Sequence, residues 1–83
     1  MHVTTVEQTC EIPLSALVPA LEQARPGLVR AKGRLVVDGR RVHVQVTPHS
    51  IDVTDADEGP TAITLISLDQ SDVENLVGII SPS

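Results

Sequence analysis

The fold of this chain is decided by residues 28–47, LVRAKGRLVVDGRRVHVQVT. Two segments in which apolar residues recur flank the dipeptide Asp38-Gly39. This dipeptide is typical of a two-residue type I′ turn, because both of its residues must adopt a positive φ angle. We therefore predict a β-hairpin with strands over residues 28–37 and 40–47.

The turn also predicts the register of the hairpin. If Val37 pairs with Arg40, the apolar pairs on one face are Leu35 with Val42, Gly33 with Val44 and Ala31 with Val46. The polar pairs on the other face are Arg34 with His43, Lys32 with Gln45 and Arg30 with Thr47. A slip of one residue would move the apolar set to the solvent face, so turn chemistry and side-chain polarity support the same register.

Before the hairpin, the pattern predicts a strand and a helix. Residues 2–12 alternate, with one face made of Thr4, Val6, Gln8, Cys10 and Ile12. Leucine and alanine spacing predicts a helix over residues 15–24 with Ser15 as its N-cap. Pro19 allows a later start, at residue 18, because proline is tolerated only in the first helical turn.

After the hairpin, we expect a strand over residues 49–54, an acidic loop over 55–60 and a strand over 61–68. The last strand is apolar on both faces, which is typical of a central or covered strand. A capping box formed by Ser71 and Glu74 predicts a helix that ends near residue 80. The order β-α-β-β-β-β-α indicates an α+β fold. We expect one domain over residues 1–83, with one mostly antiparallel sheet of about five strands and two helices on one face.

Composition excludes several partners and compartments. The 83 residues carry a net charge of −5 and no aromatic side chain, which disfavours binding to nucleic acid. No apolar run approaches the roughly 18 residues that cross a bilayer, and no secretion signal is recognisable, so we expect no membrane partner and a cytoplasmic location. The single cysteine, Cys10, cannot form an internal disulfide.

The sequence contains no recognised motif for catalysis or cofactor binding. Its five glycines do not have P-loop spacing, and it has no Gly-x-Ser-x-Gly, His-Glu-x-x-His or Cys-x-x-Cys motif. The three histidines and Cys10 lack the regular spacing of a zinc site, although His43 and His49 could approach across a turn. We predict no catalytic residue, no metal, no cofactor and no enzymatic activity, with Cys10 as a buried, inert thiol.

Positive charge is concentrated in one segment. All six Lys and Arg residues lie within residues 25–41. The predicted register places a cationic stripe on one face of the hairpin, formed by Arg30, Lys32, Arg34, Arg41 and His43. Two interpretations remain open: cross-strand ion pairs with Glu7 and Glu11 of the first strand, or a surface that binds a partner or an anion.

The segment Val29-Arg30-Ala31-Lys32-Gly33 resembles the Arg-x-Lys-Gly motif in the C-terminal domain of CobW-type GTPases, a family of metal chaperones and cobalamin-biosynthesis accessory proteins. The similarity extends to residues 13–17, to the strand around residues 63–67 and to the helix from Ser71. The sequence departs from the family in having no aromatic residue after Gly33, no P-loop GTPase domain and no cysteine metal motif. The resemblance therefore assigns only Arg30, Lys32 and Gly33.

The resemblance implies a non-enzymatic protein-interaction or regulatory domain that acts in metal homeostasis or cobalamin biosynthesis. The partner implied is a protein, with a P-loop GTPase domain as the candidate. A homo-oligomer is the other way to cover a strand that is apolar on both faces. The alternative function is a small-anion or metabolite sensor that uses the basic sheet face.

Overall fold

The hairpin predicted around Asp38-Gly39 forms the middle of the sheet. The computed structural model describes residues 2–25 and 27–82. Both turn residues have positive φ angles, 52° at Asp38 and 78° at Gly39. Strand β2 (Leu28–Val37) pairs with β3 (Arg40–Val46) from Val37 opposite Arg40 to Ala31 opposite Val46. The predicted register is confirmed for these pairs, and β3 ends one residue before the predicted pair of Arg30 with Thr47.

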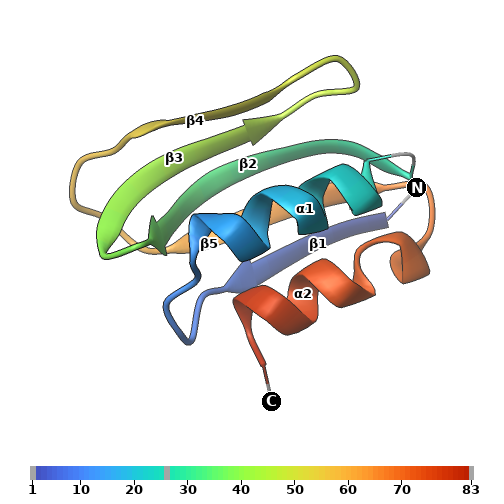
Figure 1. Ribbon diagram of the computed structural model, residues 1–83. Helices are drawn as coiled ribbons and strands as arrows, with labels where there is room; N and C mark the ends of the chain where they lie inside the picture. The colour runs from blue at the N-terminus through green and yellow to red at the C-terminus, as the bar shows by residue number, and fades with distance from the viewer. Residues whose placement is uncertain (1, 26, 83) are drawn as a thin grey trace.

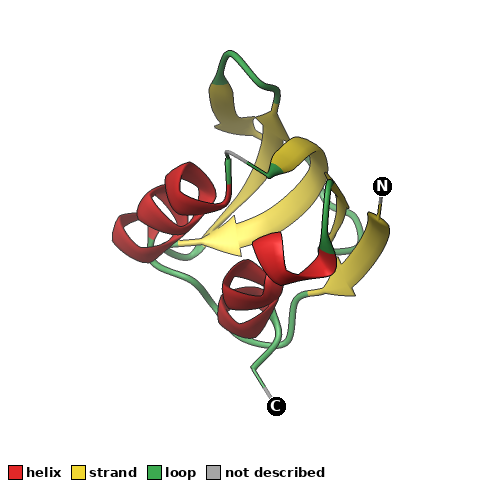
Figure 2. Cartoon of the chain, turned by 90° about the vertical axis from the view of Figure 1, so that its right-hand side faces the viewer, coloured by secondary structure: helices red, strands yellow, loops and turns green. Residues whose placement is uncertain are grey.

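Three further strands complete one antiparallel sheet of order β1-β5-β2-β3-β4 (Figure 1). They are β1 (His2–Glu7), β4 (Ile51–Asp55) and β5 (Ala62–Ser67). Two helices, α1 (Leu14–Ala24) and α2 (Glu74–Ile80), lie on the same face of the sheet, and a short 3-10 turn (Gln70–Asp72) precedes α2 (Figure 2). The predicted α+β class, element order and two-layer arrangement are confirmed. Neither helix is long and apolar enough to cross a membrane.

The hydrophobic core fills the space between the sheet and the helices. Leu35, Val44 and Leu65 of the central strands are completely buried, and so are Leu17 and Leu21 of α1. The pairing of β2 with β5 shifts by one residue between Leu28 and Arg30. This irregularity lets both Leu28 and Ala31 face the core although they are three residues apart, while Arg30 stays exposed.

Strand β1 is shorter than predicted. It ends at Glu7, and only Ile12 of the following segment returns to the sheet, as an isolated parallel bridge to Val37. The prediction of a buried thiol is therefore wrong, because Cys10 lies in the bend between these two points and is exposed. The alternation of residue types continues in the sequence beyond Glu7, but the pairing of β1 with β5 stops there.

The side chain of Gln8 takes the place of a strand partner for β2. Its Oε1 accepts a hydrogen bond of 2.7 Å from the Val36 N–H, and its Nε2 donates to the carbonyls of Val36 and Cys10 at 2.8 Å each. We expect Gln8→Ala to lower the free energy of unfolding by about 2 kcal/mol, because it leaves a half-buried backbone N–H without a partner. Urea denaturation measures the change. The control is Thr9→Ala, which removes the exposed neighbouring side chain and should leave the free energy of unfolding nearly unchanged; equal losses for the two variants would contradict the role of Gln8.

Both helices begin differently from the prediction. Helix α1 starts at Leu14, after Pro13, and Ser15 is not its cap. Instead, the Leu14 N–H donates to Asp38 Oδ2 at 3.2 Å, so the hairpin turn caps the helix.

The predicted capping box of Ser71 and Glu74 is also wrong. The box forms in the 3-10 turn, where Asp69 accepts from the Ser71 N–H and Asp72 accepts from the Asp69 N–H, each at 3.1 Å. The bond from Ser71 holds the pKa of Asp69 below its ordinary value. The 3-10 turn occupies the residues that were expected to begin the helix, so α2 starts only at Glu74.

Candidate interaction site

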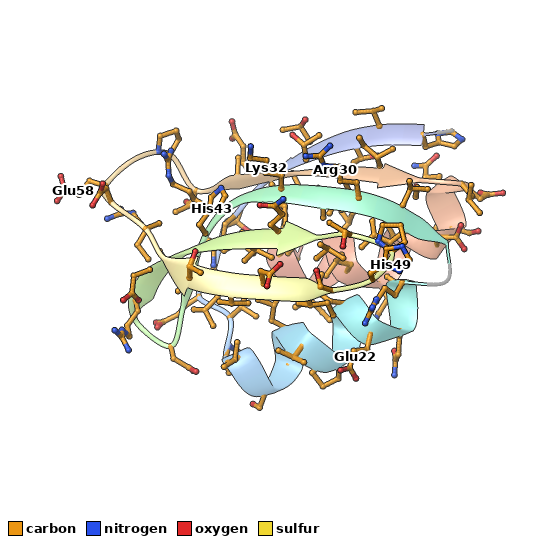
Figure 3. All side chains as sticks on the ribbon, turned by 90° about the horizontal axis from the view of Figure 1, so that it is seen from above. Glu22, Arg30, Lys32, His43, His49 and Glu58 are labelled. Atoms are coloured by element: carbon orange, nitrogen blue, oxygen red, sulfur yellow. The ribbon has the colours of Figure 1, made fainter. Side chains whose placement is uncertain are left out.

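The face of the sheet opposite the helices, the outer face, carries the cationic stripe. Arg30, Lys32 and Arg34 alternate along β2, and the latter two lie opposite Gln45 and His43 of β3. Arg41 lies further along β3, opposite Val36. Figure 3 shows Arg30 and Lys32 along β2, with His43 on the neighbouring strand. The structure thus brings the five predicted residues to one surface.

The predicted ion pairs with the first strand do not form. Strand β5 lies between β1 and β2, so Glu7 is opposite Ala62 and is separated from the stripe by a whole strand. Glu11 lies beside Gly39, at the hairpin turn. Among the described residues, the ion pair that does form joins Arg40 to Asp55 at 3.4 Å, with both side chains exposed. The interpretation of the stripe as a set of cross-strand ion pairs is wrong, because β5 separates the cations of β2 from Glu7 of β1.

The cations are not equivalent. Arg34 is half-buried, and its guanidinium lies against Gly59 in the loop between β4 and β5. A hollow of about 260 Å³ beside it is lined by His43, Asp55 and Asp57, among others. Arg30 and Lys32 are exposed, and their β5 neighbours are uncharged. Arg30 and Lys32 are therefore free to meet an external anion, whereas Arg34 is partly engaged with the acidic loop.

Apolar side chains lie next to the free cations. Ile66 of β5 is opposite Arg30 on one side and opposite Val3 of β1 on the other. Val3 is 67% exposed, and Leu68, two residues beyond Ile66, is 61% exposed. We call the five residues Val3, Ile66, Leu68, Arg30 and Lys32 the outer patch. The sequence predicted that the last strand is apolar on both faces, but it did not single out Val3, whose neighbours show no clear apolar alternation.

The possible metal ligands lie apart. His43 lies midway along β3, whereas His49 is in the turn between β3 and β4 (Figure 3). The exposed Cys10 lies near α2, where its Sγ is 3.9 Å from the Ile79 carbonyl oxygen. Over residues 2–25 and 27–82, no three His, Cys, Asp or Glu side chains gather in a way that could hold a metal ion.

Comparison with known proteins identifies a fold. No family model and no curated protein matches this sequence. Among solved structures, the chain is similar to a zinc(II)-bound triple mutant of the YjiA GTPase, with a TM-score of 0.71 and 20% sequence identity. The match covers 93% of this chain but 27% of the YjiA chain. YjiA is a CobW-family GTPase, so the resemblance to the C-terminal domain of CobW-type proteins is confirmed at the level of the fold.

Proposed function

We propose that this chain is a non-enzymatic interaction domain that docks on an acidic protein surface through its outer face. The observation that carries the proposal is the pair of exposed cations, Arg30 and Lys32, which form no ion pair with the described residues and adjoin exposed apolar side chains. A chain with a net charge of −5 presents four of its six Lys and Arg residues on one face, Arg30, Lys32, Arg34 and Arg41, and such a local field steers an oppositely charged partner.

The candidate partner is a P-loop GTPase domain. The fold matches a segment that makes up 27% of a GTPase chain, which supports a GTPase domain as the natural neighbour of this one. A role in metal homeostasis or cobalamin biosynthesis, in the cytoplasm, follows from the resemblance to CobW-type proteins and is part of the same proposal.

A non-enzymatic role is supported by the arrangement of the nucleophilic side chains. A serine or cysteine nucleophile needs a base within hydrogen-bond distance. In the part of the chain that the structure describes, no histidine side chain forms a hydrogen bond with a serine, threonine or cysteine. Two hydroxyl pairs do occur, Thr5 with Thr64 and the part-buried Thr47 with Ser50, and each joins two similar groups. Ser50 also donates to Asp52 at 3.2 Å, but this bond is exposed to water.

The alternative function is a sensor for a small anion or metabolite. The exposed Arg30 and Lys32 also support this reading, because charge-assisted hydrogen bonds would hold a phosphate or carboxylate. The hollow beside Arg34 is a weaker anion site, since Asp55 and Asp57 on its rim would repel the ligand. Calorimetry with inorganic phosphate, nucleotides and zinc distinguishes the two functions, because an interaction domain should bind none of them tightly.

The docking role predicts a salt-dependent association rate. At low salt, we expect the triple variant Arg30→Ala, Lys32→Ala, Arg34→Ala to associate with the GTPase domain about tenfold more slowly than the native chain, and its rate to depend less on salt. Stopped-flow association at two salt concentrations measures both quantities.

The control for this experiment is Arg25→Ala, which removes a cation near α1 rather than on the outer face. Its association rate should equal that of the native chain. Lys32→Ala alone should change the free energy of unfolding by less than about 1 kcal/mol. Urea denaturation of the triple variant itself, which also removes the half-buried Arg34, separates lost folding from slow binding. Equal rates and equal salt dependence for the native chain and the triple variant would refute the docking role.

A further inference from the structure

We infer that the element bound by the outer patch is an amphipathic helix of the partner, with one apolar row and one acidic row. In this arrangement the helix lies along β5 and β2. Its apolar row covers Val3, Ile66 and Leu68, and its carboxylates meet Arg30 and Lys32. This inference rests on the proposed function and specifies which kind of partner element the outer face takes.

The apolar half of the outer patch is continuous. Val3 and Ile66 are paired across β1 and β5, and Leu68 follows Ile66 by two residues, just beyond the end of β5. Two of these side chains are more than half exposed. The opposite face of β5 is already covered, because Ile63 and Leu65 are buried beneath the helices. Covering the outer side chains would remove further apolar surface from water, which is the main favourable contribution to protein association.

The charged half runs parallel to the apolar half. Arg30 of β2 lies opposite Ile66 of β5, and Lys32 lies opposite Thr64. The two cations therefore form a row along β2, next to a row of uncharged side chains along β5. Neighbouring strands are about 5 Å apart, and residues two apart on a strand are separated by about 7 Å. Acidic side chains four residues apart on a helix are about 6 Å apart along its axis. A helix can therefore place successive carboxylates near successive cations.

The polar groups beside the apolar half do not oppose burial. Thr5 and Thr64, which lie next to Val3 and Ile66 in the sheet, share a hydrogen bond of 3.2 Å between their Oγ1 atoms. Burying an unpaired hydroxyl would cost free energy, but each of these has a partner. A helix lying across them leaves neither hydroxyl without a hydrogen bond.

The sheet geometry favours a helix over an added strand. Strands β5 and β2 already pair on both sides, so an extended peptide on the outer face would find no free backbone groups with which to pair. A helix satisfies its own backbone hydrogen bonds and needs only a surface. Figure 2 shows that the inner face of this sheet is covered by helices in the same way.

Charge disfavours a second copy of this chain as the occupant. Two outer faces packed about a two-fold axis that passes near Arg30 and Lys32 would place these cations of one copy near the same cations of the other. Like charges in a buried interface are unfavourable, whereas an acidic helix neutralises them. The outer patch is therefore suited to a different, negatively charged element.

Synthetic helical peptides test this inference directly. The probe is a peptide of about 14 residues, roughly 20 Å long as a helix, with leucines on one row and glutamates beside it. One control peptide has the same composition in an order that destroys the apolar row, and a second has lysine in place of glutamate. We expect calorimetry to show at least about tenfold tighter binding of the first peptide, since it alone matches both halves of the patch. Amide chemical shifts should change along β5 and β2.

Variants of this chain separate the two halves of the outer patch. Val3→Ser, Leu68→Ser should weaken binding of the acidic peptide about fivefold or more while its salt dependence stays the same. Arg30→Glu, Lys32→Glu should reverse the preference, so that the lysine peptide binds better than the glutamate peptide. The control Arg25→Glu, Arg40→Glu carries the same net charge but alters cations outside the patch, and it should bind the acidic peptide as the native chain does.

The outcomes distinguish this inference from the proposed function. Equal affinity for all three peptides would overturn the helix assignment, and the proposed function would stand if association with the GTPase domain remained salt-dependent. The expected peptide affinities together with no association with the GTPase domain would support the helix assignment and overturn the choice of partner. Binding of inorganic phosphate at the patch without any peptide preference would overturn both in favour of an anion sensor.

Discussion

Gly33→Val is expected to lower the free energy of unfolding by about 3 kcal/mol or more, because it forces β2 away from β5. A Cβ atom at Gly33 would overlap the carbonyl oxygen of Ala62 and the Cα of Ile63. These are backbone atoms, so no side-chain rotation relieves the overlap. The space that the missing side chain leaves at Gly33 is taken by the neighbouring strand β5. Urea denaturation monitored by far-ultraviolet circular dichroism measures the loss.

Gly78 supplies the matched control for this prediction. It lies in α2, and a Cβ atom there would meet nothing within 4 Å. Gly78→Ala should therefore raise the free energy of unfolding by about 0.5–1 kcal/mol through helix propensity alone. An unchanged denaturation midpoint for Gly33→Val would mean that β5 does not approach β2 as closely as described, and the strand order would need revision.

Leu65→Ala is expected to cost about 3 kcal/mol, whereas Ile66→Ala in the same strand should cost about 1 kcal/mol. Leu65 points into the core and is completely buried, while Ile66 lies on the outer face and is half-buried. Removing the Leu65 side chain leaves a cavity among the residues of the core. Removing the Ile66 side chain mainly affects a part of the protein surface that is already in contact with water. Thermal and urea denaturation of both variants give the difference.

This pair of variants also examines whether the outer face is available for binding. A loss for Ile66→Ala as large as that for Leu65→Ala would show that Ile66 is packed in the isolated chain. The outer patch would then have no free apolar half. A small loss for Ile66→Ala, combined with weaker peptide binding, would assign this side chain to recognition.

The features that local chemistry determines were predictable from the sequence. The positive φ angles at Asp38 and Gly39 follow from the turn dipeptide, and the turn fixes every pair between β2 and β3. That register was sufficient to place Arg30 and Lys32 on one face. The elements and their order also follow from apolar spacing and helix-breaking residues.

The strand order could not be derived in this way. Strand β5 inserts between β1 and β2, and its partners are far away in the sequence, so no local pattern marks them. The error about Glu7 has this origin, since β1 was expected to lie beside β2. The error about Cys10 arose because the alternation continues in the sequence past Glu7, where β1 ends. The error about Ser71 arose because the capping pattern begins three residues before the helix, in the 3-10 turn.

The position of β1 has a consequence for how folding and recognition are coupled. This strand pairs with β5, near the other end of the chain, so forming the contact requires closing a loop that contains most of the sequence. Contacts of such long range slow folding, and the hairpin of β2 and β3 has no comparable barrier. The apolar half of the outer patch joins Val3 of β1 to Ile66 of β5 and exists only after this closure. A ligand of the patch therefore selects completely folded molecules and, by mass action, shifts the folding equilibrium toward them.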